Sequence, residues 1–220
     1  MIKLVLLDFD DTLCLTEETA FVVENEVAKS MGHAPMTRAV HQRNWGDLLE
    51  VAITERIPGI DAKEFMNRLG GYVKRFTDNG TLDAIRKENL RTLQTLRAKG
   101  KRIGILTSRS LPEITHLMLP SHPLSVHIEQ FYHKDNSRHL KPDPRAFEQA
   151  LEDFAVLPEE AVYVGDAVSD AVAANGAGLH FIAVLESGLR KRAEFEKQNV
   201  DFFAPKFTDI TTYILHKGAR

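Results

Sequence analysis

An apolar run near the start of this chain ends abruptly in acidic residues. Residues 4–13 read Leu-Val-Leu-Leu-Asp-Phe-Asp-Asp-Thr-Leu, so three carboxylates follow the run within four positions. A short continuous apolar run is typical of a strand buried on both faces, as in a parallel sheet. Ligand sites of such sheets lie at the carboxyl ends of the strands. Asp8 and Asp10 are therefore expected at a functional site, although an acidic turn without function would show the same pattern.

The second half of the chain alternates between expected strands and helices. This alternation predicts a parallel sheet with right-handed crossovers. Strands are expected at 102–106, 126–132, 161–164 and 180–185, with helices between them, over 188–197 and near 208–215. We therefore expect a three-layer α/β/α Rossmann-like core with a parallel sheet, formed by residues 1–14 and 84–220.

Residues 35–80 have helical character throughout, and no convincing strand appears between Leu15 and Asp83, so this mostly helical block is too long for one crossover helix. Residues 15–83 therefore predict an inserted helical domain. Thr16 is a candidate N-cap for its first helix, and Asp61 with Glu64 resembles a capping box. The pair Gly70-Gly71 argues against one unbroken helix at that point.

The composition is that of an ordinary globular protein, with 43% hydrophobic residues and a formal net charge of −3. This charge gives no indication of a nucleic-acid surface. The single cysteine, Cys14, cannot form an intramolecular disulfide, which fits a reducing compartment. No apolar stretch is long enough for a membrane helix, so we expect a cytoplasmic protein. The oligomeric state is left open.

Polar residues also follow three later segments. Thr107 and Ser108 come after a strand, where a hydroxyl and backbone amides can hold an anion, or can simply cap the next helix. Lys141 lies in a stiff Lys-Pro-Asp-Pro turn, either near carboxylates or in solvent. Asp166 and Asp170 are four residues apart, so an early helical turn would place both on one face. Close carboxylates repel each other, and a divalent cation such as Mg²⁺ relieves that repulsion.

Together these segments resemble the four motifs of the haloacid dehalogenase-like hydrolase superfamily. The motifs occur in order as Asp8-Phe9-Asp10-Asp11-Thr12-Leu13, Thr107 after Ile105-Leu106, Lys141 before Pro142-Asp143-Pro144, and Gly165-Asp166 with Asp170. The helical insert matches the position of the family's C1 cap. The resemblance spans nearly the whole chain.

The resemblance implies a mechanism. Asp8 would attack phosphorus to form an aspartyl-phosphate, and Asp10 would act as the general acid and base. It further implies that Mg²⁺ is bound by Asp8, the Asp10 backbone carbonyl and Asp166, with Asp170 supporting the ion directly or through water. The phosphoryl oxygens would be held by Thr107, the Ser108 amide and Lys141.

Two positions depart from the commoner family pattern. Asp11 replaces a glycine, and aspartate tolerates unusual backbone angles better than most residues. Arg109 replaces an asparagine and is expected to alter contacts near the phosphate. An acid at position 10 favours phosphate-ester chemistry over dehalogenation within the superfamily.

The resemblance implies a phosphatase acting on a small phosphorylated metabolite, similar to phosphoglycolate phosphatases. Sugar phosphates and nucleotide monophosphates remain open as substrates. A β-phosphoglucomutase-like phosphotransferase and a catalytically weak phosphate-binding protein are the alternatives. The cap would select the substrate, and its polar or aromatic candidates are Arg43, Asn44, Trp45, Gly46, Arg56, Lys74 and Arg75. Solvated helix faces, and packing of Trp45 in the interior, are the plain alternatives for these residues.

Overall fold

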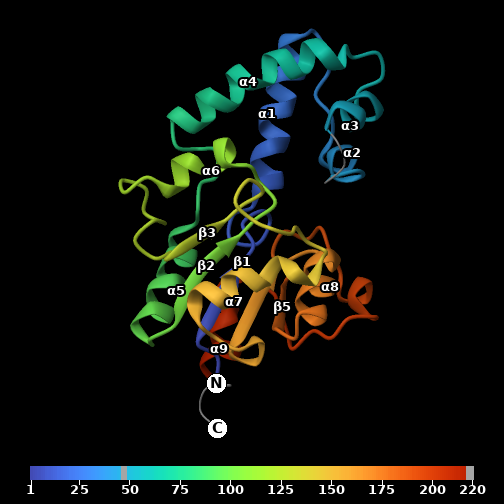
Figure 1. The fold of residues 1–220 in the computed structure, drawn as a ribbon. Coiled ribbons are helices and arrows are strands. Elements are labelled where there is room, and N and C mark those ends of the chain that lie inside the picture. Colours follow the sequence, from blue (N-terminus) through green and yellow to red (C-terminus); the bar gives the residue numbers. More distant parts are fainter. Residues whose placement is uncertain (46–48, 217–220) are drawn as a thin grey trace. The chain divides into compact units, whose positions relative to one another are not determined.

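The computed structural model describes residues 1–45 and 49–216 and divides the chain into two compact units. One comprises Met1–Cys14 with Ile85–Arg220, and the other is the continuous segment Leu15–Ala84 (Figure 1). We call them the core unit and the helical unit.

The core unit is built on a six-stranded parallel sheet of order β3-β2-β1-β4-β5-β6. Its strands are β1 Leu4–Leu7, β2 Arg102–Leu106, β3 Gln130–Tyr132, β4 Ala161–Gly165, β5 His180–Val184 and β6 Phe202–Ala204. The chain extends the sheet first to one side of β1 and then, from β4 on, to the other. This order confirms the predicted Rossmann-like core, and it places the topological switch point between β1 and β4.

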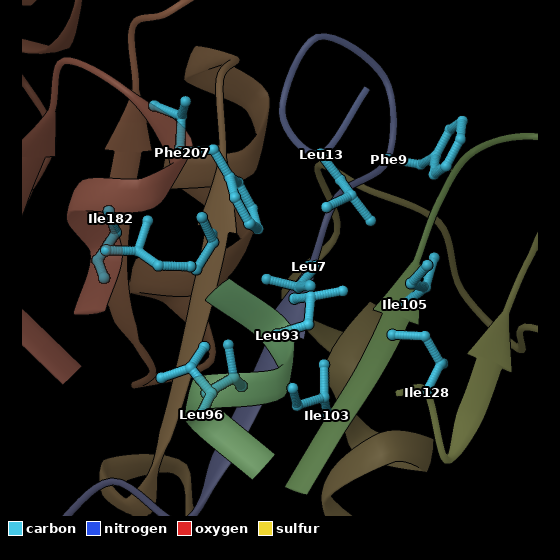
Figure 2. Packing of buried hydrophobic residues seen from close by; sticks show 14 of the residues in the cluster. Leu7, Phe9, Leu13, Leu93, Leu96, Ile103, Ile105, Ile128, Ile182 and Phe207 are labelled. Carbon is cyan, nitrogen blue, oxygen red and sulfur yellow. The ribbon is translucent and has the colours of Figure 1, made fainter. Parts of the chain in front are cut away.

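The central strands are apolar because helices cover both faces of the sheet. Along β1, Val5 and Leu7 belong to one hydrophobic cluster and Leu4 and Leu6 to the other, as the two-residue period of a strand requires. Figure 2 shows the first cluster, with Leu7 of β1 among its labelled side chains. Its helices are α5 Lys87–Ala98, α6 Leu111–Met118 and α9 Ile210–His216, while α7 Glu148–Phe154 and α8 Val168–Gly176 contribute to the second.

The C-terminal part of the core unit differs from the sequence-based expectation. Residues 188–197, all of which the structure describes, form no α-helix and contain only a 3₁₀ turn at Arg192–Phe195. The buried Phe195 packs in this turn against Phe181 and Phe203. The packing of these aromatic rings determines the conformation of the segment and outweighs the helix propensity of its charged residues. The short edge strand β6 was not expected.

The helical unit consists, in its described part, of α1 Thr16–Ser30, α2 Arg38–Gln42, α3 Leu49–Arg56 and α4 Ala62–Asp78. Thr16 is the first helical residue rather than the N-cap, which is Leu15. Asp61 caps α4 as predicted, accepting the Glu64 N–H at 3.0 Å. The expected interruption at Gly70-Gly71 is wrong, because α4 runs through both residues.

The polar and aromatic candidates of the helical unit lie in different environments. Lys74 and Arg75 are exposed and form surface ion pairs with Asp78 and Glu26. Arg43 is exposed, and Asn44 donates to Glu55 at 2.9 Å. Gly46 lies outside the described residues. Trp45 is half-buried against the His41 ring, and Arg56 is buried rather than solvated. No helix in the described part of the chain is both long and apolar enough to cross a membrane.

A network of polar and ionisable side chains is buried inside the helical unit. It contains Glu17 and Glu24 from α1, His41 from α2 and Arg56 from α3. The His41 Nδ1 lies 2.7 Å from Glu17 Oε1, and Arg56 Nη1 donates to Glu24 Oε2 at 2.7 Å. Burial alone would raise the pKa of Glu17, but hydrogen bonds from Arg38 and His41 outweigh it and lower that pKa below its ordinary value of 4.5.

We expect Glu17 to make the helical unit acid-sensitive. Because its pKa is lower in the folded state, its contribution to stability is complete above pH 4.5 and is lost as pH falls through the folded-state pKa. Glu17→Gln should lower the free energy of unfolding near neutral pH by about 2 kcal/mol and flatten this acid dependence. Urea unfolding of the full chain at neutral and acidic pH measures both effects.

Glu18→Gln is the matched control, because the neighbouring Glu18 side chain is 50% exposed. An equal loss of stability in both variants would contradict a specific role for the buried carboxylate.

Candidate active site

Three of the predicted site residues follow adjacent strands of the sheet. Asp8 comes directly after β1, Thr107 after β2 and Asp166 after β4, and β1 pairs with both other strands. The Asp8 N–H donates to Val164 O at 2.8 Å, which continues the ladder into the site. Because all three strands are parallel, these residues lie at one edge of the sheet, at the switch point.

Lys141 joins the site from a loop far along the chain. Its Nζ lies 3.0 Å from Asp8 Oδ1 and 2.8 Å from Asp170 Oδ1. It also donates to the Tyr163 hydroxyl at 2.7 Å. The three donors of an ammonium group are thus directed at three buried partners. The interpretation of Lys141 as a solvated loop residue is wrong, since its side chain is only 7% exposed.

Tyr163 is a member of this cluster that the sequence analysis missed. It lies in β4 and is fully buried, and its hydroxyl donates to Leu106 O at 3.0 Å. This bond links β4 to the end of β2, next to Thr107. The one available signal was a tyrosine in an otherwise aliphatic strand, since a buried hydroxyl needs a partner.

The carboxylates form a compact, buried group. Asp8, Asp166 and Asp170 each offer an oxygen, and these oxygens lie within 4.8 Å of one another. Asp170 lies in the first turn of α8, and its Oδ2 accepts the Ala167 N–H at 3.0 Å. Asp166 precedes this helix rather than sharing a helical face with Asp170, because the N-cap is Ala167.

Negative charge exceeds positive charge in this group of side chains. Burial, together with the charges of Asp170 and Asp10, raises the pKa of Asp8 to about 7 against the opposing effect of Lys141. Burial and the neighbouring carboxylates also raise the pKa of Asp166. The pKa of Lys141 is raised despite burial, because Asp170 and Asp8 stabilise its charged form. One ammonium therefore faces three carboxylates, and an oxygen-only donor set of this kind fits a hard divalent cation such as Mg²⁺.

Asp10 points to a different partner from the other acids. Arg109 binds it through Nη2 at 2.6 Å from Oδ1 and through Nε at 3.0 Å from Oδ2. The guanidinium also stacks on Phe9, with its carbon 4.8 Å from the ring centroid. The departure at position 109 therefore brings a cation onto the predicted acid–base residue. Asp11 adopts φ 51°, the left-handed conformation that the glycine of the commoner pattern would adopt most easily.

The second motif lies beside this ion pair. Thr107 is buried, and its Oγ1 accepts the Arg109 N–H at 3.2 Å. Ser108 is exposed and follows it in the chain. The described contacts thus form one cluster around Lys141 and a second around Arg109, linked by the Asp8–Asp10 turn.

The fold and this site define an α/β protein with a buried oxygen-rich centre at the switch point of its sheet. The sequence profile of the haloacid dehalogenase-like hydrolases matches residues 5–184, and the chain belongs to this family.

Individual relatives extend the comparison. The chain is 25% identical to a phosphoglycolate phosphatase from Nitrosospira multiformis over 97% of its length and 96% of that protein. It is 31% identical to the pyrophosphatase PpaX of Bacillus cereus, over 54% of each chain. A crystal structure from Thermotoga maritima, provisionally assigned as a β-phosphoglucomutase, superposes with a TM-score of 0.78 at 22% identity, covering 98% of this chain and 99% of that one. The last comparison shows the fold alone.

Gly165 is required by the position of Asp170. A Cβ on this residue would lie 2.4 Å from Asp170 Oδ2, and Asp170 cannot move away without losing its bonds to Lys141 and Ala167. We expect Gly165→Ala to lower the free energy of unfolding by about 2 kcal/mol through this overpacking. A crystal structure of the variant should show Asp170 displaced.

Gly71→Ala provides the matched control, because a Cβ there meets nothing within 4 Å. This change should leave the protein as stable as the wild type or slightly more stable, since alanine favours a helix interior. Equal stability of Gly165→Ala and the wild type in urea unfolding would contradict the packing argument.

Proposed function

We propose that this protein is a Mg²⁺-dependent phosphatase that hydrolyses a small phosphorylated metabolite through an aspartyl-phosphate on Asp8. The observation that carries the proposal is the position of Asp8, buried at the end of β1 with Lys141 Nζ 3.0 Å from one oxygen. Asp166 and Asp170 lie beside it. Membership of the hydrolase family and similarity to a phosphoglycolate phosphatase support phosphate-ester chemistry.

In the first step Asp8 attacks phosphorus. An Asp8–phosphorus bond forms, the bond to the leaving oxygen breaks, and Asp10 gives a proton to that oxygen. In the second step a water attacks the same phosphorus, Asp10 takes a proton from it, and the bond to Asp8 breaks. When bound, Mg²⁺ would be held by Asp8, Asp166, the Asp10 carbonyl and Asp170, and would offset charge on the transferring phosphoryl group.

Lys141 orients the nucleophile in this scheme. Its contacts with Asp8 and Asp170 fix the carboxylate that attacks, and its charge favours a phosphoryl group arriving there. Because its donors are directed at Asp8, Asp170 and Tyr163, a bond to a phosphoryl oxygen would replace one of these contacts. Thr107 and Ser108 are the further candidates for holding phosphoryl oxygens.

Arg109 bears on the acid–base step. Its guanidinium contacts both oxygens of Asp10, so the proposed acid–base residue is held by an arginine. A guanidinium so close to the reacting centre is also placed to meet an anionic group of the substrate. The proposed acid–base step therefore takes place on a carboxyl group that Arg109 orients.

The nucleophile can be tested with p-nitrophenyl phosphate. Wild-type protein should release phosphate with Mg²⁺ and lose this activity in EDTA. Asp8→Asn should reduce kcat by about 10³-fold or more, because an amide is a far weaker nucleophile than a carboxylate. Asp78→Asn is the control, since Asp78 is 62% exposed in a surface ion pair. Activity that survives in Asp8→Asn would show that another group attacks phosphorus.

The products separate hydrolysis from phosphotransfer. A phosphatase releases inorganic phosphate from phosphoglycolate or a sugar phosphate in proportion to the substrate consumed. A β-phosphoglucomutase-like enzyme would instead convert a sugar phosphate to its isomer without net release. For whichever of the two substrates is consumed, we expect stoichiometric phosphate release, measured by ³¹P NMR; isomer formation without release would assign the chain to the phosphotransferases.

A further inference from the structure

The helical unit contains a cavity of about 310 Å³ that the proposed phosphate chemistry does not use. The lining residues that the structure describes all belong to this unit. Its walls include Ala20 and Val23 of α1, Leu49 of α3, Leu69 and Val73 of α4, and Trp45. An apolar concavity of this size lies at the lower end of the range for small-molecule sites.

The charged residues that line the cavity neutralise each other. Among the described residues these are Glu24 and Arg56, which pair at 2.7 Å with their side chains 4% and 2% exposed. Arg56 Nε also donates to Asn44 Oδ1 at 2.7 Å, so its guanidinium is committed within the unit. A phosphate or carboxylate placed here would lose its hydration without gaining a cation of its own. The cavity therefore disfavours an anionic ligand.

We propose that this cavity binds an uncharged, largely apolar group of a small molecule, such as a ring or a branched alkyl chain. The aliphatic walls and the Trp45 ring supply apolar contact area, and the Glu24–Arg56 pair supplies a polar edge for a hydroxyl group. The occupant is either the alcohol part of a phosphate ester or a separate neutral molecule. Only the first of these rests on the proposed phosphatase function.

The chain carries its own reporter for this site, because Trp45 is its only tryptophan. Cyclohexanol is a suitable probe, since it is apolar, uncharged and does not absorb where tryptophan does. It should shift Trp45 emission to shorter wavelength in a saturable way, with a Kd on the order of 1 mM. The polyol myo-inositol has the same ring and six hydroxyl groups, and it should produce no saturable shift.

Two variants test the location of binding. Ala20→Phe fills the cavity and should weaken cyclohexanol binding at least tenfold, whereas Val22→Phe adds the same ring at a 45% exposed position of the same helix and should not. Val73→Thr, nearly isosteric, should weaken binding about threefold by making one wall polar. Circular dichroism establishes that each variant is folded. No saturable shift in the wild type, an equal response to myo-inositol, or unchanged affinity in folded Ala20→Phe and Val73→Thr would overturn the proposal.

Kinetics distinguish the two sources of the ligand. If the occupant is part of the substrate, cyclohexanol inhibits hydrolysis of cyclohexyl phosphate competitively, and Ala20→Phe raises KM for that ester. If it is a separate molecule, cyclohexanol still produces its own saturable shift of Trp45 emission when cyclohexyl phosphate is present at a saturating concentration. The fluorescence titration measures binding without turnover. Binding can therefore be confirmed or rejected even if the phosphatase proposal fails.

Discussion

The site depends on one ammonium group, that of Lys141, placed between two buried carboxylates. Buried charges are costly unless paired, and removing one partner leaves the others uncompensated. Lys141 contacts Asp8 from the N-terminal strand and Asp170 from α8, so it joins segments 133 and 29 residues away. The surplus of negative charge that remains is what makes this end of the sheet suited to a cation.

The sheet order makes this convergence available. Since β1 lies between β2 and β4, the pairing of these three parallel strands already brings together the residues that follow them. Small residues then allow the close approach that the side chains need. Gly165 leaves room for Asp170, and Gly176 of α8 leaves room for Pro144, at the end of the Lys141 loop. Backbone packing and the position of the charges are therefore set by the same few residues.

The sequence predicted those features that follow from strand ends, and it missed those that depend on contacts distant in the chain. The positions of Asp8 and Asp166 follow from the end of an apolar run. The partnership of Tyr163 with Lys141 could not be predicted in this way, because nothing in a buried strand identifies the partner of one hydroxyl. Similarly, strand β6 is too short to show a period, and the aromatic contacts of Phe195 overrode local helix propensity.

The two units handle buried charge in opposite ways, and this difference separates the ligands that each can hold. In the core unit, three carboxylates face one ammonium, which favours a cation. In the helical unit, Glu17 and Glu24 are balanced by arginines of the same unit, so the described residues give its cavity no unbalanced charge. The acidic centre and the neutral cavity therefore differ in the ligands that they suit: a cation in the core unit, and an uncharged, apolar group in the helical unit.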